Sequence, residues 1–510
     1  MSRVIVPGAV PLRLLRELRE AGAVALCEGW REGVEASAAA VAAIAARGEP
    51  TYGVNTGFGR LATARIAEDR LAQLQLNLVR SHAAGVGPPL PPHLARLVIA
   101  LKAAALARGY SGVRPVVIEA LIGLLSADAL PLIPAQGSVG ASGDLAPLAH
   151  LALVLLGEGE ARLPSGRIVS GAEALLFADL EPLALAPKEG LALLNGTQVS
   201  CALALDALFR LENAFATALI AGALSVDGAR GADTPFDPRI QDLRGQRGQA
   251  DVAACLRAVL AGSAIRESHR LGDPRVQDPY SLRCQPQVMG AALDLIRFAA
   301  GILATEANAV TDNPLVFAET GEILSGGNFH AEPVAFAADI LALATAEIAN
   351  LAERRIALLM DPALSGLPPF LAANPGLDSG FMLAHVTAAA LAAETKALAS
   401  PRSIDTIPTS ANQEDHVSLA TAASHRLGAM LDNLETILAI EALVAAQAVE
   451  AHRPLHSSET LEQALAQVRA RVPRWEQDRV AAGDIATLRA MVAEGTLASL
   501  APIGLPSCNG

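Results

Sequence analysis

A short run with Ala141-Ser142-Gly143 at its centre is the part of this chain whose residue types could create an unusual reactive group. It reads Q-G-S-V-G-A-S-G-D-L-A-P-L-A-H from Gln136 to His150, and its three glycines allow a sharp backbone turn. If the nitrogen of Gly143 attacks the carbonyl carbon of Ala141, a five-membered ring closes. Loss of water from Ser142 then leaves an exocyclic methylene on an imidazolone, which is a carbon electrophile that no unmodified side chain supplies.

Each position of this triplet suits the ring closure. Glycine at the attacking position adds no side chain that would crowd the ring, alanine at the attacked position is small, and serine carries a β-leaving group. The same letters are also typical of a glycine-rich turn before a helix that Ser142 or Asp144 would cap. An isolated triplet favours this simpler interpretation, so the rest of the chain has to decide between the two.

Two of the three tyrosines lie in polar runs of a chain that is mostly aliphatic. Tyr52 lies in the loop-like run T-Y-G-V-N-T-G-F-G, and Tyr280 lies in R-V-Q-D-P-Y-S-L-R-C between Gln277 and Arg283. If Tyr280 and Arg283 share a helical turn, their side chains point to the same side. An arginine can bind a carboxylate with two hydrogen bonds, and a phenol can relay a proton if neighbours lower its pKa. The alternative for the second run is a polar surface loop.

Four other residues stand out in short runs of their own. Asn195 lies in L-L-N-G-T-Q, where its amide could bind the carboxylate or amine of a substrate, or simply begin a helix. His82 ends an apolar helix-like run, which is a usual place for a structural histidine or a partner of the helix dipole. Phe329 follows a glycine turn in S-G-G-N-F-H, and Glu414 precedes a long apolar run, where an acid is common for dipole reasons alone.

Taken in order along the chain, these runs resemble the methylidene-imidazolone (MIO) ammonia-lyase family of aromatic amino acid lyases. The positions that match the family pattern are Tyr52, His82, Ser142, Asn195, Gln277, Tyr280, Arg283, Phe329 and Glu414. The runs S-H-A-A-G at 81–85 and Q-E-D-H at 413–416 resemble the histidine-specific members rather than those that act on phenylalanine or tyrosine. An imidazole needs polar partners such as His82 and Glu414, whereas an apolar ring would leave each unpaired at roughly 1–3 kcal/mol.

The resemblance implies a mostly α-helical fold with a long central bundle, of the fumarase/aspartase-like architecture. It also implies a homotetramer in which each active site draws residues from three subunits. The implied reaction is the conversion of L-histidine to trans-urocanate and ammonia, the first step of histidine degradation. The implied cofactor is the MIO group, formed autocatalytically from Ala141-Ser142-Gly143, with no metal and no nucleotide.

The resemblance also assigns roles to the matching residues. The catalytic residues it implies are Tyr52, Ser142, Tyr280 and Glu414. The substrate-binding residues it implies are His82, Asn195, Gln277, Arg283, Phe329 and Glu414. In this scheme Arg283 holds the substrate carboxylate with help from Asn195, and either Tyr52 or Tyr280 is the base that removes the β-proton.

Two other functions are compatible with parts of the pattern. A phenylalanine or tyrosine ammonia-lyase, or an aminomutase, would use the same electrophile, but the runs around His82 and Glu414 argue against an apolar substrate ring. A non-catalytic helical scaffold would keep the fold without the chemistry, but it would have no need for the intact set of polar runs.

Composition and charge limit the class of protein. Hydrophobic residues make up 52% of the 510 residues and aromatic residues only 3%, so we expect helices packed through small side chains. The net charge of −13 argues against a nucleic-acid partner. The five cysteines show no C-x-x-C spacing, and no secretory leader is evident, so we expect a reduced, cytoplasmic protein without disulfides or a zinc-cysteine site.

The elements that must position these residues are long helices. Apolar spacing near 3.6 residues predicts helices over about 199–224, 287–309, 333–359 and 416–450. Charges such as Asp294 and Arg297 interrupt the apolar runs, so we expect buried helices rather than membrane spans. We expect an N-terminal helical domain that carries the Ala-Ser-Gly loop (1–224), a central bundle (225–450) and a helical tail (451–510), with borders that are not sharp.

Overall fold

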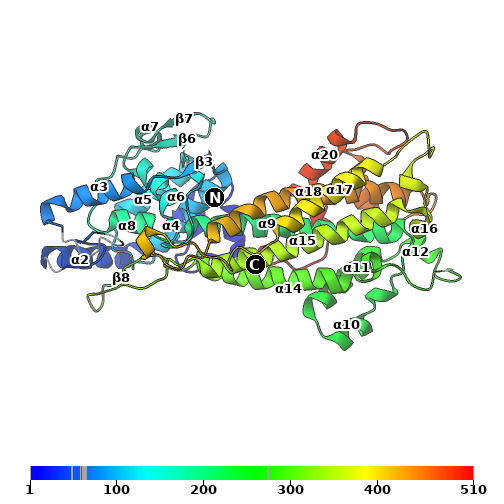
Figure 1. The fold of residues 1–510 in the computed structure, drawn as a ribbon, viewed down its shortest axis with the longest axis horizontal. Helices are drawn as coiled ribbons and strands as arrows, with labels where there is room; N and C mark the ends of the chain where they lie inside the picture. The colour runs from blue at the N-terminus through cyan, green and yellow to red at the C-terminus, as the bar shows by residue number, and fades with distance from the viewer. Residues whose placement is uncertain (1, 48–49, 58, 60–65, 274, 509–510) are drawn as a thin grey trace.

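The computed structural model describes residues 2–47, 50–57, 59, 66–273 and 275–508, and these form an elongated, mostly helical molecule (Figure 1). Shorter helices from the N-terminal part of the chain gather at one end, and long helices from the rest run away from them side by side. The expected fold class, mostly α with a long central bundle, is therefore confirmed.

The bundle is built around α9, in which every side chain except those of Arg210 and Asn213 is buried. It contains α9 (Gln198–Gly228), α11 (Arg247–Leu260), α14 (Gln285–Ala307), α15 (Glu332–Met360), α17 (Met382–Leu398), α18 (Ala420–Glu450) and α20 (Ala481–Ala493). Small side chains let these helices approach closely. A Cβ atom added to Gly228 would lie only 2.7 Å from the Cβ atom of Ala448 on α18.

The N-terminal end combines helices with short strands. Its helices are α1 (Leu12–Glu17), α2 (Trp30–Arg47), α3 (Leu71–His82), α4 (Pro92–Leu106), α5 (Pro115–Ser126), α6 (Leu145–Leu155), α7 (Gly171–Phe177) and α8 (Glu189–Leu194). Its strands are β1 (Arg3–Ile5), β2 (Val24–Leu26), β3 (Val86–Pro89), β4 (Leu130–Pro131), β5 (Pro134–Gln136), β6 (Glu160–Arg162) and β7 (Ile168–Ser170). Strand β1 pairs with β2 in parallel, whereas the pairs β3–β5, β4–β6 and β6–β7 are antiparallel.

Short elements connect and cover the long helices. The remaining α-helices are α10 (Pro238–Arg244), α12 (Ala264–Glu267), α13 (Tyr280–Arg283), α16 (Pro362–Ser365) and α19 (Glu459–Arg469). An antiparallel hairpin of β8 (Leu315–Phe317) and β9 (Glu322–Leu324) leads into the loop before α15. This loop carries Phe329, one of the residues that the sequence singled out.

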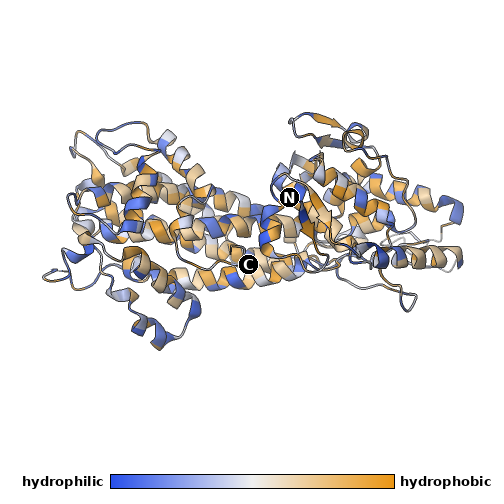
Figure 2. Cartoon of the chain, turned by 180° about the vertical axis from the view of Figure 1, so that it is seen from behind, coloured by the Kyte–Doolittle hydropathy of each residue, from blue (hydrophilic) through white to orange (hydrophobic). Residues whose placement is uncertain are grey.

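Three bundle helices, α9, α14 and α15, are long and apolar enough to cross a membrane by length and composition. The most apolar windows of α9 and α15 are 89% and 72% buried within the chain, so these two helices belong to its core, as the sequence predicted. The window of α14 is only 44% buried. Figure 2 shows hydrophobic residues spread along the whole bundle, and one of them, Phe298 on α14, is 61% exposed.

The predicted ends of the long helices agree closely with the structure except at the end of α9, which continues to Gly228 rather than ending near residue 224, and at the start of α18. This helix begins at Ala420 rather than near residue 416. Leu419 has a left-handed backbone (φ 54°), and its N–H donates to the carbonyl of Val139 at 2.9 Å instead of starting a helical turn. The proposed domain borders stay predictions. The first of them falls inside α9, which continues to Gly228.

Candidate active site

The loop that contains Ala141-Ser142-Gly143 lies between β5 and α6 and is held by a buried carboxylate. Asp144 is fully buried, and its two oxygens accept hydrogen bonds from the hydroxyls of Ser138 (2.8 Å), Ser200 (2.7 Å) and Thr421 (3.0 Å) and from the backbone N–H of Ser200 (2.7 Å). Ser200 lies near the start of α9 and Thr421 near the start of α18. The loop is therefore fixed to the N-terminal ends of the two central helices, where the dipoles favour a negative charge.

Gly143 occupies a position that a larger residue cannot take. Its backbone is left-handed (φ 72°), and an added Cβ atom would lie 2.2 Å from the carbonyl oxygen of Gly196. The two glycines form a parallel β-bridge, and the N–H of Asp144 donates to the Gly196 carbonyl at 2.8 Å. Gly143 is thus pressed against the Asn195-Gly196 turn, which brings Asn195 next to the loop.

Ser142 makes two contacts with residues that are distant in the sequence. Its hydroxyl donates to Oε1 of Glu414 at 2.7 Å, and its carbonyl accepts from the Asn195 amide at 2.6 Å. Asn195 is only 3% exposed, and its buried Oδ1 atom accepts no hydrogen bond from the part of the chain that the structure describes. An acceptor is therefore available beside Ser142 for an N–H donor.

Glu414 is fixed in an ionised form by the segment that precedes it. Burial alone would raise the pKa of Glu414, but hydrogen bonds from Thr409, Ser142 and Ser410 outweigh it, and with the nearby His82 they lower the pKa. The Thr409 hydroxyl donates to Oε2, and the two backbones pair as a β-bridge.

The backbone of the segment between Thr409 and Glu414 is strained. Ser410, Ala411 and Asn412 are all left-handed, with φ of 53°, 54° and 64°. Such a conformation costs about 1–2 kcal/mol for each residue that is not glycine. Strained backbone that the surroundings maintain is typical of functional sites.

Ser142, Asn195 and Glu414 line a cavity of about 960 Å³ between the N-terminal helices and the ends of the bundle. The sequence-predicted residues that it brings together are Tyr52, His82, Ser142, Asn195, Phe329 and Glu414. His82 ends α3, and its Nδ1 atom lies 2.8 Å from the carbonyl oxygen of Leu78. A carbonyl can only accept, so Nδ1 carries the proton, and in the neutral ring Nε2 is then an acceptor. The cavity therefore presents an imidazole and a carboxylate close to Ser142.

Comparison with known proteins identifies the family. The model of the aromatic amino acid lyase family matches residues 13–470. The chain belongs to the aromatic amino acid lyase family. It is 58% identical to a histidine ammonia-lyase of Burkholderia pseudomallei, over 99% of this chain and 99% of that relative.

Solved structures of the family share the fold of this lyase. A histidine ammonia-lyase from Trypanosoma cruzi superposes with a TM-score of 0.90 at 39% identity, over 98% of this chain and 95% of that one. A tyrosine aminomutase from Streptomyces globisporus superposes with a TM-score of 0.93 at 35% identity, over 99% of both chains. The fold therefore accommodates enzymes for different amino acids, and the residues of the site must decide the substrate.

Membership of this lyase family implies an MIO group, and the residues at the loop fit its precursor. Ala141 is small and 5% exposed, Ser142 offers a hydroxyl as leaving group, and Gly143 stands where a Cβ atom cannot be placed. The bend at Gly143 and its contact with Gly196 satisfy the steric requirement inferred from the sequence. The simpler interpretation, a helix cap, does not explain the contacts, because the Asp144 side chain makes no capping hydrogen bond to α6.

Three of the residues matched to the family pattern lie elsewhere in this lyase chain. Tyr280 and Arg283 share the single helical turn of α13, as predicted, and the guanidinium lies over the tyrosine ring at 4.6 Å. Next to them, the amide of Gln285 donates to the carbonyl of Gly222 on α9 at 3.3 Å. Ser200, at the Ser142 loop, and Gly222 are about 33 Å apart along α9 at roughly 1.5 Å per residue. Gln277 is exposed and belongs to the segment just before α13.

The sequence did not reveal Lys102, which lies beneath the site. It is buried on α4, and its ammonium group donates to the carbonyls of Asn195 (2.8 Å) and Ala192 (3.0 Å) at the end of α8. Burial lowers the pKa of Lys102 to about 8, even though Asp312 and Asp144 favour its charged form. Lys102 therefore fixes the backbone of the residue that binds Ser142. A lone lysine in the apolar run L-V-I-A-L-K-A-A-A-L was the signal that could have revealed it.

Proposed function

We propose that this chain is a histidine ammonia-lyase that converts L-histidine to trans-urocanate and ammonia. The observation that carries the proposal is the contact between Ser142 and Glu414 in a cavity that also presents His82. An imidazole can donate its N–H to a carboxylate and interact with a second imidazole, whereas a phenyl ring would leave both groups unpaired. The similarity to histidine ammonia-lyases along the whole chain supports the same substrate.

Ala141, Ser142 and Gly143 are the proposed precursors of the MIO group. This group would supply an electrophilic carbon for the substrate amine, so that ammonia can leave. Its formation removes two water molecules, one in ring closure and one from Ser142. Loss of the Ser142 hydroxyl also frees Oε1 of Glu414, which then can accept the N–H of an imidazole.

The chain's own residues would bind and orient the amino acid. Glu414, fixed by Thr409 on one oxygen, accepts the imidazole N–H with the other. The amide of Asn195 lies next to the loop, and its unbonded Oδ1 can accept an N–H of the neutral substrate amine, which keeps its lone pair for the reaction. Tyr52 lines the same cavity and is the first candidate for the base that removes the β-proton, with Tyr280 as the second.

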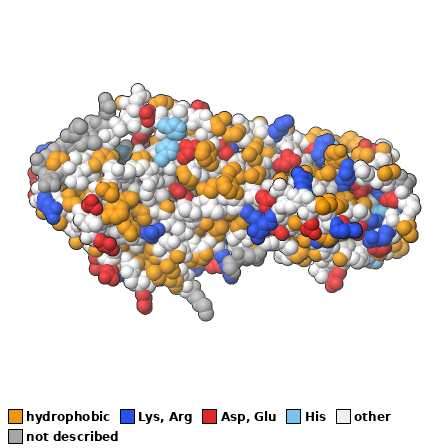
Figure 3. Space-filling model, turned by 90° about the horizontal axis from the view of Figure 1, so that it is seen from below, with side chains coloured by type: hydrophobic (Ala, Val, Ile, Leu, Met, Phe, Trp, Pro, Cys, Tyr) orange, Lys and Arg blue, Asp and Glu red, His pale blue; other side chains and the backbone are white. Residues whose placement is uncertain are grey.

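We also propose that the complete site needs other copies of this chain in a homotetramer. Tyr280 is 70% exposed, and the α13 end of the bundle lies far from Ser142 in the same chain, so Gln277, Tyr280 and Arg283 would enter the site of another subunit. The long helices also leave apolar side chains uncovered. They include Phe298 on α14 (61% exposed), Phe336 and Leu343 on α15 (both 50%), and Leu383 on α17 (59%). The space-filling view in Figure 3 shows hydrophobic patches between the charged groups of one face. Apolar surface of this kind is typical of subunit contacts.

Product analysis tests the proposed reaction. Purified protein is incubated with L-histidine, and urocanate and ammonia are measured in the same samples. The proposal predicts equal amounts of the two products, together with an intact mass that is lower than the sequence mass by two water molecules. A protein that retains both waters and forms no urocanate would instead be the non-catalytic scaffold.

A further inference from the structure

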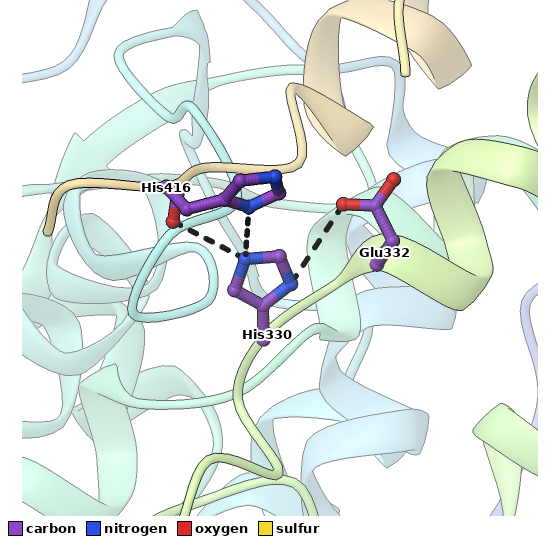
Figure 4. Close-up of side chains that lie close together, drawn as sticks. All are labelled: His330, Glu332 and His416. Carbon is purple, nitrogen blue, oxygen red and sulfur yellow. Dashed lines mark hydrogen bonds and ion pairs between the residues drawn. The ribbon is translucent and has the colours of Figure 1, made fainter. Parts of the chain in front are cut away.

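A second group of polar side chains, separate from the residues proposed to act on histidine, lies at the edge of the cavity. It consists of His330, Glu332 and His416. One side-chain nitrogen or oxygen atom from each lies within 4.8 Å of the other two. Figure 4 shows the ring of His330 between the ring of His416 and the carboxylate of Glu332, so that the three side chains point toward one another. They come from two separate segments, because His330 lies in the loop that leads into α15 and Glu332 is the first residue of that helix, whereas His416 lies in the segment before α18.

The contacts inside this cluster leave its polar atoms poorly satisfied. Nε2 of His330 lies 3.4 Å from Nδ1 of His416 and 3.2 Å from the His416 carbonyl oxygen, and Nδ1 of His330 lies 3.9 Å from Oε2 of Glu332. The first distance is long for a hydrogen bond. Oε2 of Glu332 is buried and accepts no hydrogen bond from the described part of the chain. Buried acceptors without a partner are rare, and a bound ion is one explanation for them.

Two imidazoles and one carboxylate are a ligand set that zinc uses in proteins. Bonds of roughly 2.0–2.1 Å place the donor atoms of a tetrahedral site roughly 3.4 Å apart. One donor atom from each of the three residues already lies within 4.8 Å of the other two, so side-chain shifts of roughly 1–1.5 Å would bring the atoms to this spacing. The side chains of His330 and Glu332 are 30% and 23% exposed, and His416 is exposed, so an ion can reach them from solvent.

We propose that His330, Glu332 and His416 bind one divalent transition-metal ion of the zinc class. His330 follows Phe329 directly, and His416 lies two residues after Glu414, so the ion joins two walls of the cavity. The three ligands leave a fourth position for water. This site goes beyond the proposed lyase function and does not depend on it, because neither the Ser142 loop nor turnover of histidine is needed to bind the ion.

Calorimetric titration of tag-free, chelator-treated protein with zinc chloride tests the proposal. We expect one ion per chain, and affinity at least tenfold weaker in both Glu332→Gln and His416→Gln. His456→Gln is the matched control, because His456 also lies near a glutamate, Glu462, at 3.6 Å but has no second imidazole beside it in that pair. Absence of a one-to-one site, wild-type affinity in either cluster variant, or loss of binding in the control would overturn the proposal.

Cobalt chloride provides a second measurement on the same variants. A cobalt ion bound by two imidazoles and a carboxylate should show visible absorption bands of a four- or five-coordinate site in the wild type. These bands should be lost in Glu332→Gln, whose thermal stability and intact mass show whether it has folded and matured. Identical spectra in the wild type and in folded Glu332→Gln would contradict the assignment of Glu332 as a ligand.

Discussion

Glu414 accepts a hydrogen bond of 2.7 Å from the hydroxyl of Ser142, although 272 positions separate the two residues in the chain. The contact joins the proposed electrophile to a carboxylate whose pKa is lowered, despite its burial, by hydrogen bonds from Thr409, Ser142 and Ser410. It therefore places a negative charge, fixed in direction, beside the position where the substrate amine would react. An amino acid with an imidazole side chain can use that charge, and one with a phenyl ring cannot.

Replacing Glu414 by glutamine should separate a catalytic role from a structural one. Glutamine keeps the size and much of the hydrogen bonding but removes the charge, so kcat for L-histidine should fall at least roughly 100-fold. The melting temperature should change little, because the amide oxygen of glutamine can still accept a hydrogen bond from the Thr409 or Ser142 hydroxyl. Steady-state kinetics would be compared with Asp415→Asn, an exposed neighbour at the same cavity. Intact mass shows whether the variant has lost its two waters, and a matured variant with normal kcat would rule out the pocket role.

Replacing Gly143 by alanine should prevent maturation. The left-handed backbone (φ 72°) and the distance of 2.2 Å between an added Cβ atom and the Gly196 carbonyl force the loop to move. Gly301→Ala on α14 is the control, because nothing lies within 4 Å of its Cβ position. Mass spectrometry should show both waters retained in Gly143→Ala and lost in Gly301→Ala. Normal loss of water from Gly143→Ala would contradict the proposed steric requirement.

Mixing two inactive variants should test whether subunits share a site. Ser142→Ala removes the electrophile, and Arg283→Ile removes the proposed carboxylate ligand, so each homotetramer should lose at least roughly 100-fold in kcat/KM. If Arg283 acts in the site of another subunit, some sites of a hybrid tetramer contain both wild-type residues. Co-expression or subunit exchange should then restore measurable turnover. If verified hybrid tetramers showed no turnover, Arg283 and Ser142 of different chains would not act together in one site.

Lys102 should give the protein a characteristic dependence of stability on pH. Its pKa in the folded chain is about 8, below the usual 10.5, so between these values the unfolded chain binds more protons than the folded chain. The cost of burying the charge is fully present below pH 8 and is relieved as the pH rises. The wild type should therefore gain stability relative to Lys102→Met, by at most about 1.4 kcal/mol per pH unit. Between pH 7 and pH 10 the melting temperature of the wild type minus that of Lys102→Met should rise with pH, whereas the same difference for Lys396→Met, at an exposed position, should stay constant. If the difference for Lys102→Met stayed level or fell, the result would contradict the account.

The sequence predicted the long helices well because their signal is local. The apolar spacing placed one helix over 333–359, and α15 occupies Glu332–Met360. The start of α18 was predicted too early because Leu419 gives its N–H to Val139, a partner that is distant in the sequence. Apolar periodicity carries no information about such a partner.

For the candidate site as well, the sequence predicted one part of the arrangement and could not predict the rest. The family resemblance collected Tyr52, His82, Ser142, Asn195, Phe329 and Glu414, and the structure places them around one cavity. It could not show that Thr409 fixes Glu414, since that pairing depends on left-handed residues that few sequences would suggest. The position of Arg283 far from Ser142 in the same chain also depends on the length and direction of α9, which only the fold provides.

The most direct test of the central claim is the specificity of the purified wild-type protein for its amino acid. L-histidine, L-phenylalanine and L-tyrosine are supplied separately, and kcat/KM is determined from the absorbance of each conjugated product. The contact between Ser142 and Glu414, together with His82 in the same cavity, predicts that L-histidine is preferred by at least roughly 100-fold, the scale of two unpaired polar groups. Equal or faster turnover of phenylalanine or tyrosine would contradict the account.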